Sequence, residues 1–188
     1  MYSQIKQALA VLEAGGTILY PTDTIWGIGC DAANATAVKA IYRLKRRADN
    51  KAMILLADSV GAIEACVGQL PPEAMKFVDD RNRPTTVVYD HCRGVAPELL
   101  GADGSVGMRV THEEFSQRLC KAFGRPIVST SANISGQKPP AQFSDIDPEI
   151  IAGVDFVVDW NREDNGEIRP PSRVVKVSAD GQITILRP

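Results

Sequence analysis

Residues that bind metals are scarce in this sequence. It has four cysteines and two histidines among 188 residues. The cysteines are Cys30, Cys66, Cys92 and Cys120, and the histidines are His91 and His112. Because the cysteines are widely separated and form no C-x-x-C pair, we expect no zinc site and no other dedicated metal site. Unpaired thiols are typical of the reducing cytoplasm, and we expect all four to be buried there.

Long apolar runs and a strong net charge are also missing. No segment approaches the roughly 20 apolar residues of a membrane-spanning helix, so we expect no membrane contact. The amphipathic N-terminus carries Glu13, which argues against a signal peptide. A net charge of -2 argues against a protein whose whole surface binds nucleic acid, and it leaves room for a local basic patch. The length of 188 residues indicates one domain over residues 1–188, and the hydrophobic share of 44% supports a real core.

The most unusual stretch is P-I-V-S-T-S-A-N-I-S-G, residues Pro126–Gly136. Ile127 and Val128 are typical of a buried strand, and hydroxyl and amide side chains follow, up to Gly136. Such short uncharged donors can hold an anion or a sugar at the end of a strand. The alternative is a Ser/Thr-rich turn whose side chains bond only to their own backbone.

A second strand end carries similar chemistry. The predicted strand Thr17–Tyr20 runs into Pro21, which ends it, and Thr22 and Thr24 follow with Trp26. Because ligands of α/β sheets bind outside strand ends, the two hydroxyl-bearing ends suggest two walls of one cleft. The alternative makes both threonines turn formers and Trp26 a core residue.

A third feature is a strongly basic helix end. Apolar spacing predicts a helix over Asp31–Arg47, with Asn34 or Thr36 as its cap. Five cations lie within nine residues at the end of this helix and just beyond it, and they are Arg43, Lys45, Arg46 and Arg47, with Lys51 after a polar turn. Capping of the helix dipole explains some of them, at about 0.3–1 kcal/mol each. The mutual repulsion of the rest needs a counter-anion, which a triphosphate or an RNA backbone would supply.

The other predicted elements complete an α/β pattern. Helical spacing marks segments 5–12, 60–67, 71–78 and 113–123, and strand patterns mark 53–57, 83–89, 104–110 and 154–158. A final hairpin, 171–177 with 183–187, is predicted to turn at Asp180-Gly181. We therefore expect one α/β domain, a twisted mixed parallel and antiparallel sheet with surrounding helices and a deep basic cleft. Arg109, at a strand end, suits a carboxylate ligand or a structural salt bridge.

Three blocks of the sequence resemble the hallmark blocks of the YrdC-like domain family, the threonylcarbamoyl-AMP synthases, in wording, order and spacing. They are Y-P-T-D-T-I-W-G-I-G-C-D, K-R-R-A-D-N-K-A-M-I-L-L-A and S-T-S-A-N-I-S-G, and the resemblance extends from Ile5 to Pro188. It implies an enzyme, a nucleotidyltransferase that condenses L-threonine, bicarbonate and ATP to threonylcarbamoyl-AMP and pyrophosphate. The product would serve the threonylcarbamoyladenosine modification of tRNA through a downstream transferase.

The resemblance also implies a role for each matching residue. Lys45 and Arg47 would be catalytic and, with Lys51, hold the phosphates. Ser131, Asn133 and Arg187 would complete the nucleotide site. The threonine site would consist of Thr24, Arg109, Ser129 and Ser172, with Thr22 a weaker candidate. Mg²⁺ is expected to arrive with ATP, carried by phosphate oxygens and water because no carboxylate cage is visible.

Several positions depart from the family pattern. The segment Arg83-Pro84-Thr85-Thr86 keeps only Pro84 and Thr86 of the usual W-P-G-P-L-T, which puts the shape of this wall in question. Leu56 stands where longer two-domain relatives have histidine, which resembles the short single-domain branch. Arg173 replaces a threonine after Ser172. None of these changes removes a charge that the reaction needs.

The main alternative is a protein of the same fold that binds tRNA or double-stranded RNA without catalysis, through the basic helix end. The YciO-like branch lacks an intact S-A-N-x-S-G block, and this chain retains it. The carbamoyl-transferring domain of large multidomain proteins is a further alternative, and the sequence has no flanking zinc-finger or acylphosphatase segment to support it. Formation of the adenylate would distinguish the enzyme from both.

Overall fold

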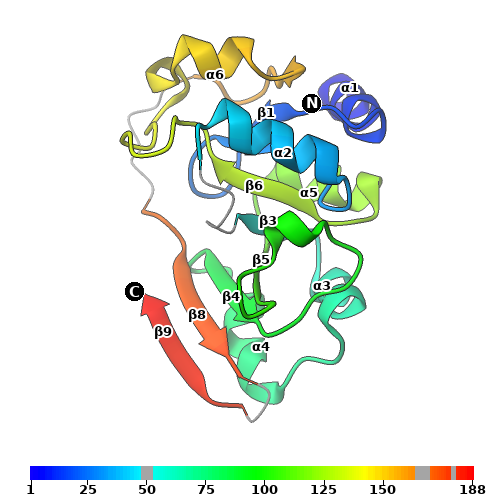
Figure 1. Cartoon of the computed structure of the whole chain (residues 1–188), viewed down its shortest axis with the longest axis vertical. Coiled ribbons are helices and arrows are strands. Elements are labelled where there is room, and N and C mark those ends of the chain that lie inside the picture. The colour runs from blue at the N-terminus through cyan, green and yellow to red at the C-terminus, as the bar shows by residue number, and fades with distance from the viewer. Residues whose placement is uncertain (48–52, 164–169, 179–180) are drawn as a thin grey trace.

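The computed structural model describes residues 1–47, 53–163, 170–178 and 181–188, and Figure 1 shows their arrangement. The predictions for Lys51 and Asp180 concern residues outside these ranges. Within them, nine strands form one sheet in the order β7-β1-β2-β6-β3-β5-β4-β8-β9. The strands are β1 (Ile18–Tyr20), β2 (Gly27–Gly29), β3 (Ile54–Ala57), β4 (Thr85–Tyr89), β5 (Val106–Val110), β6 (Ile127–Ser131), β7 (Phe156–Val157), β8 (Arg173–Val177) and β9 (Ile183–Arg187).

The sheet is mixed, as predicted. β1 runs parallel to β7, β3 to β5, and β4 to β8, whereas the remaining neighbours are antiparallel. The helices are α1 (Tyr2–Glu13), α2 (Ala35–Leu44), α3 (Val60–Val67), α4 (Pro72–Val78), α5 (Glu114–Phe123) and α6 (Pro148–Ala152), with short 3-10 turns η1 (Pro97–Leu99) and η2 (Phe143–Asp145). The predicted single α/β domain with a mixed sheet and surrounding helices is therefore confirmed.

Strand alternation divides the core between the two faces of the sheet. In β3, Leu55 and Ala57 belong to one apolar cluster with α2 and α3, and Leu56 belongs to a second cluster with α1 and α5. Successive side chains of a strand point to opposite faces, so this split places the helices on both sides. In Figure 1, α2 crosses in front of β6 and α5 lies behind it.

The sequence did not predict β2. We predicted no strand between Pro21 and Cys30, and this segment contains one because Gly27–Gly29 pairs with both β1 and β6. Glycine is disfavoured in strands, so the two glycines of this segment gave no strand pattern in the sequence. A Cβ at Gly29 would lie 2.6 Å from the Val128 carbonyl oxygen and 2.7 Å from the Tyr20 ring, so this crowded position requires glycine. The turn between β1 and β2 thereby places Thr22 and Thr24 beside β6.

Helix α2 is shorter than the predicted Asp31–Arg47. It begins after Asn34, whose side chain accepts hydrogen bonds from the backbone of Thr36 and Ala37. At the other end, Arg46 is left-handed, with φ 49°, and the Arg47 amide donates to the Tyr42 carbonyl at 2.9 Å. This is the bonding pattern of a Schellman ending, which turns the chain sharply after Lys45.

The expectation of four buried thiols is wrong for two of them. Cys30 and Cys120 are buried, whereas Cys66 and Cys92 are partly exposed. The reason is their position: Cys66 lies in the last turn of α3, and Cys92 lies in the connection that leaves β4. Connections of this kind run over the protein surface.

The crowding at Gly29 predicts a difference between two glycine substitutions. Gly29→Ala should lower the free energy of unfolding by about 1–3 kcal/mol, because the new methyl group overlaps backbone and ring atoms. Gly61→Ala is the matched control: nothing lies within 4 Å of its Cβ in α3, and alanine should add up to about 1 kcal/mol. Urea unfolding followed by circular dichroism measures both, and equal stabilities would contradict the close packing of β2.

Candidate functional site

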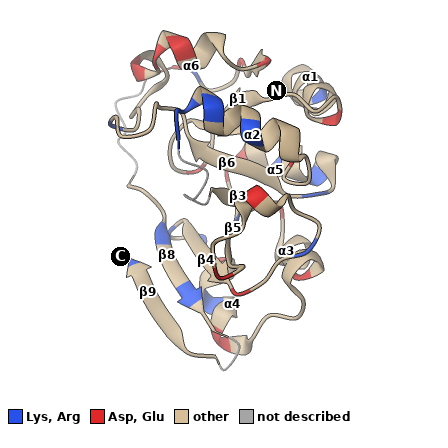
Figure 2. Cartoon of the chain, in the orientation of Figure 1, with Lys and Arg blue, Asp and Glu red and all other residues tan. Residues whose placement is uncertain are grey.

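A cavity of about 600 Å³ lies where the β1–β2 turn meets the ends of β6, β8 and β9. Eight of the eleven residues singled out in the sequence line it, and they are Thr22, Thr24, Arg47, Arg109, Ser129, Ser131, Ser172 and Arg187. Figure 2 shows the basic end of α2 on the same side of the molecule as the start of β8. The structure therefore brings most of the predicted residues together, and their individual roles stay predictions.

The charge of the cavity wall is of one sign. Arg47, Lys138, Arg109 and Arg187 line it, and no Asp or Glu does so among the described residues. Burial, and then the charge of Arg109, lowers the pKa of Arg187. The second cause indicates that the two guanidinium groups are close enough to repel each other. An anionic ligand would relieve that repulsion.

Lys45 does not line this cavity. Its side chain is 1% exposed, and Nζ donates hydrogen bonds to the carbonyl oxygens of Ser131 and, at 2.6 Å, Asn133. The Ser135 amide donates to the Lys45 carbonyl at 2.8 Å. These three bonds attach the end of α2 to the loop that follows β6, so Lys45 supports the loop from beneath.

Burial lowers the pKa of Lys45 to about 7, and the neighbouring charge of Arg47 acts in the same direction. At neutral pH the group therefore exchanges between ammonium and amine. An amine still has two N–H donors, enough for both carbonyl oxygens, so the loop stays attached in either form.

Asn133 also acts within the loop. Its Nδ2 donates to the carbonyl oxygens of Ile134 at 3.0 Å and Gln137 at 2.8 Å, and the residue is 8% exposed. It does not line the cavity. Its Oδ1 is buried and has no hydrogen-bond partner among the described residues. The loop is thus fixed partly by its own side chains, as expected if this stretch is a turn whose side chains bond to its own backbone. Ser129 and Ser131, in contrast, line the cavity.

Arg47 reaches the cavity because of the left-handed turn at Arg46. It is half-buried, and burial is the main cause that lowers its pKa from the usual value of a guanidinium. An arginine keeps its charge even so. Arg47 is therefore the described cation of the basic helix end that is placed to contact a ligand in the cavity.

The sequence did not single out Asp23, which pairs with Arg109. Arg109 is 3% exposed, and its Nη2 lies 2.8 Å from Asp23 Oδ1 and 3.5 Å from Thr24 Oγ1. The structural salt bridge considered for Arg109 is thus present, and the same guanidinium also lines the cavity. Asp23 could have been found from the sequence. It lies between Thr22 and Thr24, which were assigned to the same site as Arg109, and a buried arginine requires a carboxylate.

The threonines of the first turn differ in their bonds. Thr22 Oγ1 donates to the Ile25 carbonyl at 2.7 Å and accepts from the Thr24 amide at 3.2 Å, so it forms the turn. Trp26 is 7% exposed and makes an edge-to-face contact with Phe143, with ring centroids 4.8 Å apart. It belongs to the core and also lines the cavity.

The opposite wall is held by Ser172. Its Oγ lies 3.0 Å from Thr86 Oγ1, and Arg187 donates to its carbonyl oxygen at 2.9 Å and to its Oγ at 3.1 Å. Arg173, a departure from the family pattern, donates to Asp80 at 2.8 Å and to Thr85 at 3.0 Å. It thereby braces the altered segment where β4 begins, and Thr86, inside β4, lies beside Ser172.

The described residues offer no ready metal cage. No group of three or more His, Cys, Asp or Glu side chains among them could hold a metal ion. Likewise, none of their helices has the length and apolar character needed to cross a membrane.

The chain is similar to proteins of one family over most of its length. The model of the Sua5/YciO/YrdC family, described as Telomere recombination, matches residues 10–188. A threonylcarbamoyl-AMP synthase of Stenotrophomonas maltophilia (strain K279a) is 34% identical over 158 residues, which cover 82% of this chain and 85% of that protein. A threonylcarbamoyl-AMP synthase of Xanthomonas euvesicatoria pv. vesicatoria (strain 85-10) is 30% identical over 182 residues, which cover 95% of each.

The fold is likewise similar to a solved structure. The structure of P. abyssi Sua5 complexed with L-threonine superposes with a TM-score of 0.86 and 25% sequence identity. The match covers 98% of this chain and 53% of that one, so this chain spans about half the length of Sua5.

The lowered pKa of Lys45 predicts a pH-dependent stability. An unfolded lysine has a pKa of about 10.4, so between pH 7 and pH 10 the unfolded chain holds a proton that the native protein has released. Raising the pH in this window therefore stabilises the native state, by about 1.4 kcal/mol per pH unit. We expect the wild type to gain this stability relative to Lys45→Met between pH 7.5 and pH 9.5, as measured by urea unfolding.

The exposed Lys6→Met in α1 is the control for loss of a surface lysine. If the difference in stability between the wild type and Lys45→Met is the same at every pH, Lys45 is not a buried amine in the native protein.

Proposed function

The chain belongs to the Sua5/YciO/YrdC family, and we propose that its cavity condenses L-threonine, bicarbonate and ATP to threonylcarbamoyl-AMP and pyrophosphate. The observation that supports this most directly is the composition of the cavity. Four cations and several hydroxyl groups converge on it, with no Asp or Glu among its described lining residues. Each of the three reactants has an anionic group, and relatives that are 30–34% identical are threonylcarbamoyl-AMP synthases.

The threonine site would lie between the β1–β2 turn and β5. Arg109 would bind the carboxylate of the amino acid with the part of its guanidinium that faces the cavity, while Asp23 fixes its orientation at 2.8 Å. The hydroxyls of Thr24, Ser129 and Ser172 would position the rest of the molecule. Thr22, whose hydroxyl already bonds within the turn, would act through Thr24.

The substrate itself supplies the nucleophile. The amine of threonine adds to CO₂ derived from bicarbonate and loses a proton, which gives a carbamate. A carbamate oxygen then attacks the α-phosphorus of ATP, and the bond to pyrophosphate breaks. No protein side chain needs to form a covalent bond, so the chain contributes positioning, worth roughly 7–11 kcal/mol of the barrier, and charge stabilisation.

The nucleotide would occupy the side of the cavity formed by α2 and the loop after β6. Arg47 would bind the phosphates and stabilise the leaving pyrophosphate, and Lys51, outside the described residues, is proposed to join it. Lys45 would act from beneath the loop by holding it in place through its bonds to the Ser131 and Asn133 carbonyl oxygens. Ser131, the Asn133 loop and Arg187 would contact the rest of the nucleotide.

Mg²⁺ would enter with ATP. Because no carboxylate of the described residues lines the cavity, the ion would be held by phosphate oxygens and water. When bound, it would neutralise charge on the phosphates.

The product would be passed to a transferase that modifies tRNA. Direct binding of tRNA or double-stranded RNA, the cytoplasmic location and the extent of the domain over 1–188 stay predictions. The cavity favours the enzyme over the non-catalytic alternative, because a bounded space lined by Arg109 and hydroxyls suits small reactants, whereas an RNA backbone needs an open surface.

The test is pyrophosphate release that requires threonine, ATP and bicarbonate together. Arg47→Ala should lower kcat by at least about 100-fold, because it removes a cation from the charge that develops on the leaving group. Arg43→Ala is the matched control, since Arg43 lies on the exposed side of α2 and does not line the cavity. Pyrophosphate release that is equal without threonine, or full turnover by Arg47→Ala, would contradict the proposal.

A further inference from the structure

Two cysteines lie near each other outside the lining of the cationic cavity. Cys66 is in the last turn of α3, and Cys92 follows β4. The Arg93 amide donates to the Cys66 carbonyl at 2.9 Å, which fixes the two backbone segments side by side. Cys92 Sγ donates a hydrogen bond to the Arg93 carbonyl oxygen at 3.6 Å, and each of the two thiols shifts the pKa of the other.

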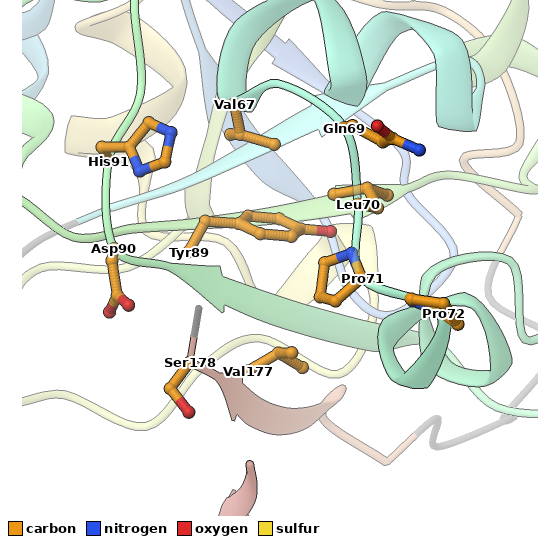
Figure 3. Close-up of a pocket in the computed structure, with 10 residues that line it drawn as sticks. All are labelled: Val67, Gln69, Leu70, Pro71, Pro72, Tyr89, Asp90, His91, Val177 and Ser178. Atoms are coloured by element: carbon orange, nitrogen blue, oxygen red, sulfur yellow. The ribbon is translucent and has the colours of Figure 1, made fainter. Parts of the chain in front are cut away.

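Figure 3 shows the surroundings of this pair. Val67 and His91, the neighbours of Cys66 and Cys92 in the chain, lie on the same side of a cavity of about 370 Å³. This cavity opens between α3, β4 and β8 and shares no lining residue with the larger one. The segments that carry the two cysteines therefore meet at a second, separate hollow of the surface.

The four cysteines of the chain divide into two classes. Cys30 and Cys120 are buried, and burial raises the pKa of both thiols. Cys66 and Cys92 are partly exposed, so a small reagent can reach them. A reactive cysteine needs both access and thiolate character, and structural buried cysteines are inert.

The interaction between the two thiols makes them unequal. The Cys92 thiol lowers the pKa of Cys66 to about 7, whereas the Cys66 thiol, together with burial, raises the pKa of Cys92. At neutral pH Cys66 thus carries a large share of thiolate, the nucleophilic form, while Cys92 keeps its proton. One sulfur can attack an oxidant, and the backbone bond between Arg93 and Cys66 keeps a resolving thiol on the adjacent segment.

We propose that Cys66 and Cys92 are a redox modification site, which hydrogen peroxide converts to a reversible disulfide. The Cys66 thiolate attacks one peroxide oxygen, the O–O bond breaks, and Cys66 becomes a sulfenic acid. The departing hydroxide takes up the proton that Cys66 released and becomes water. The Cys92 sulfur then attacks the sulfenic sulfur, the S–S bond forms, and a second water leaves with the Cys92 proton. Two thiols lose two electrons in total, and one peroxide is reduced to two waters.

The site is independent of the proposed synthase reaction. Neither cysteine lines the larger cavity, and the disulfide would join the end of α3 to the segment between β4 and η1. The experiment therefore needs no activity measurement, and its result does not depend on whether the proposed function is correct.

The experiment treats the reduced full-length protein with equimolar hydrogen peroxide at pH 7.5, followed by alkylation under denaturing conditions and mass spectrometry. We expect a loss of two hydrogens, a single Cys66–Cys92 peptide pair, and recovery of both thiols with dithiothreitol. Cys66 should be consumed at least tenfold faster than Cys30 or Cys120, which serve as internal controls.

Two variants separate the roles of the sulfurs. Cys92→Ser should stop Cys66 at the sulfenic acid, which a dimedone probe captures, and Cys66→Ser should leave Cys92 reduced under the same conditions. The proposal is overturned if the wild type accumulates sulfinic acid at Cys66 while Cys92 stays alkylated. It is equally overturned if all four cysteines react at the same rate, or if none reacts.

Discussion

The site depends on one buried contact, between the Lys45 side chain and the backbone of the loop after β6. Nζ donates to the Ser131 and Asn133 carbonyl oxygens, and the Ser135 amide donates back to the Lys45 carbonyl. Because these bonds join α2 to β6, they fix where the basic helix end and the hydroxyl-bearing loop lie relative to each other. A buried amine is costly to desolvate unless it is bonded, and both carbonyls satisfy the Lys45 amine. The lysine thus serves the site by fixing its architecture.

The wall built on this contact is charged in a way that suits anions. Arg47 and Arg187 line the cavity, and Arg109, although paired with Asp23, lowers the pKa of Arg187 further. Like charges held close together disfavour the protein on its own and favour a bound anion. The native fold therefore holds these positive charges in place before any reactant binds. Charges that are fixed in advance in this way are what the stabilisation of a transition state requires.

Much of this arrangement could be predicted from the sequence, because its chemistry lies in contiguous stretches. The hydroxyls of Ser129–Ser131 and the cap of Asn34 are local features, and the structure has the hydroxyls at the cavity and the cap at the start of α2. The features that the sequence did not predict depend on contacts between distant segments. β2 was not predicted because the need for glycine at Gly29 comes from its close approach to Val128, a residue of another strand. The burial of Lys45 was not predicted because it depends on the loop after β6, which is distant in the sequence. The pairing of Asp23 with Arg109, and of Cys66 with Cys92, likewise requires the fold.

The attachment of the loop by Lys45 can be measured directly by amide hydrogen exchange. In Lys45→Met, the amides of residues 131–137 should exchange at least about tenfold faster than in the wild type, with the largest change at Ser135, while the amides of α5 and β3 keep their protection. If the loop amides of Lys45→Met instead exchange at the wild-type rate, the Lys45 contact does not hold the site together.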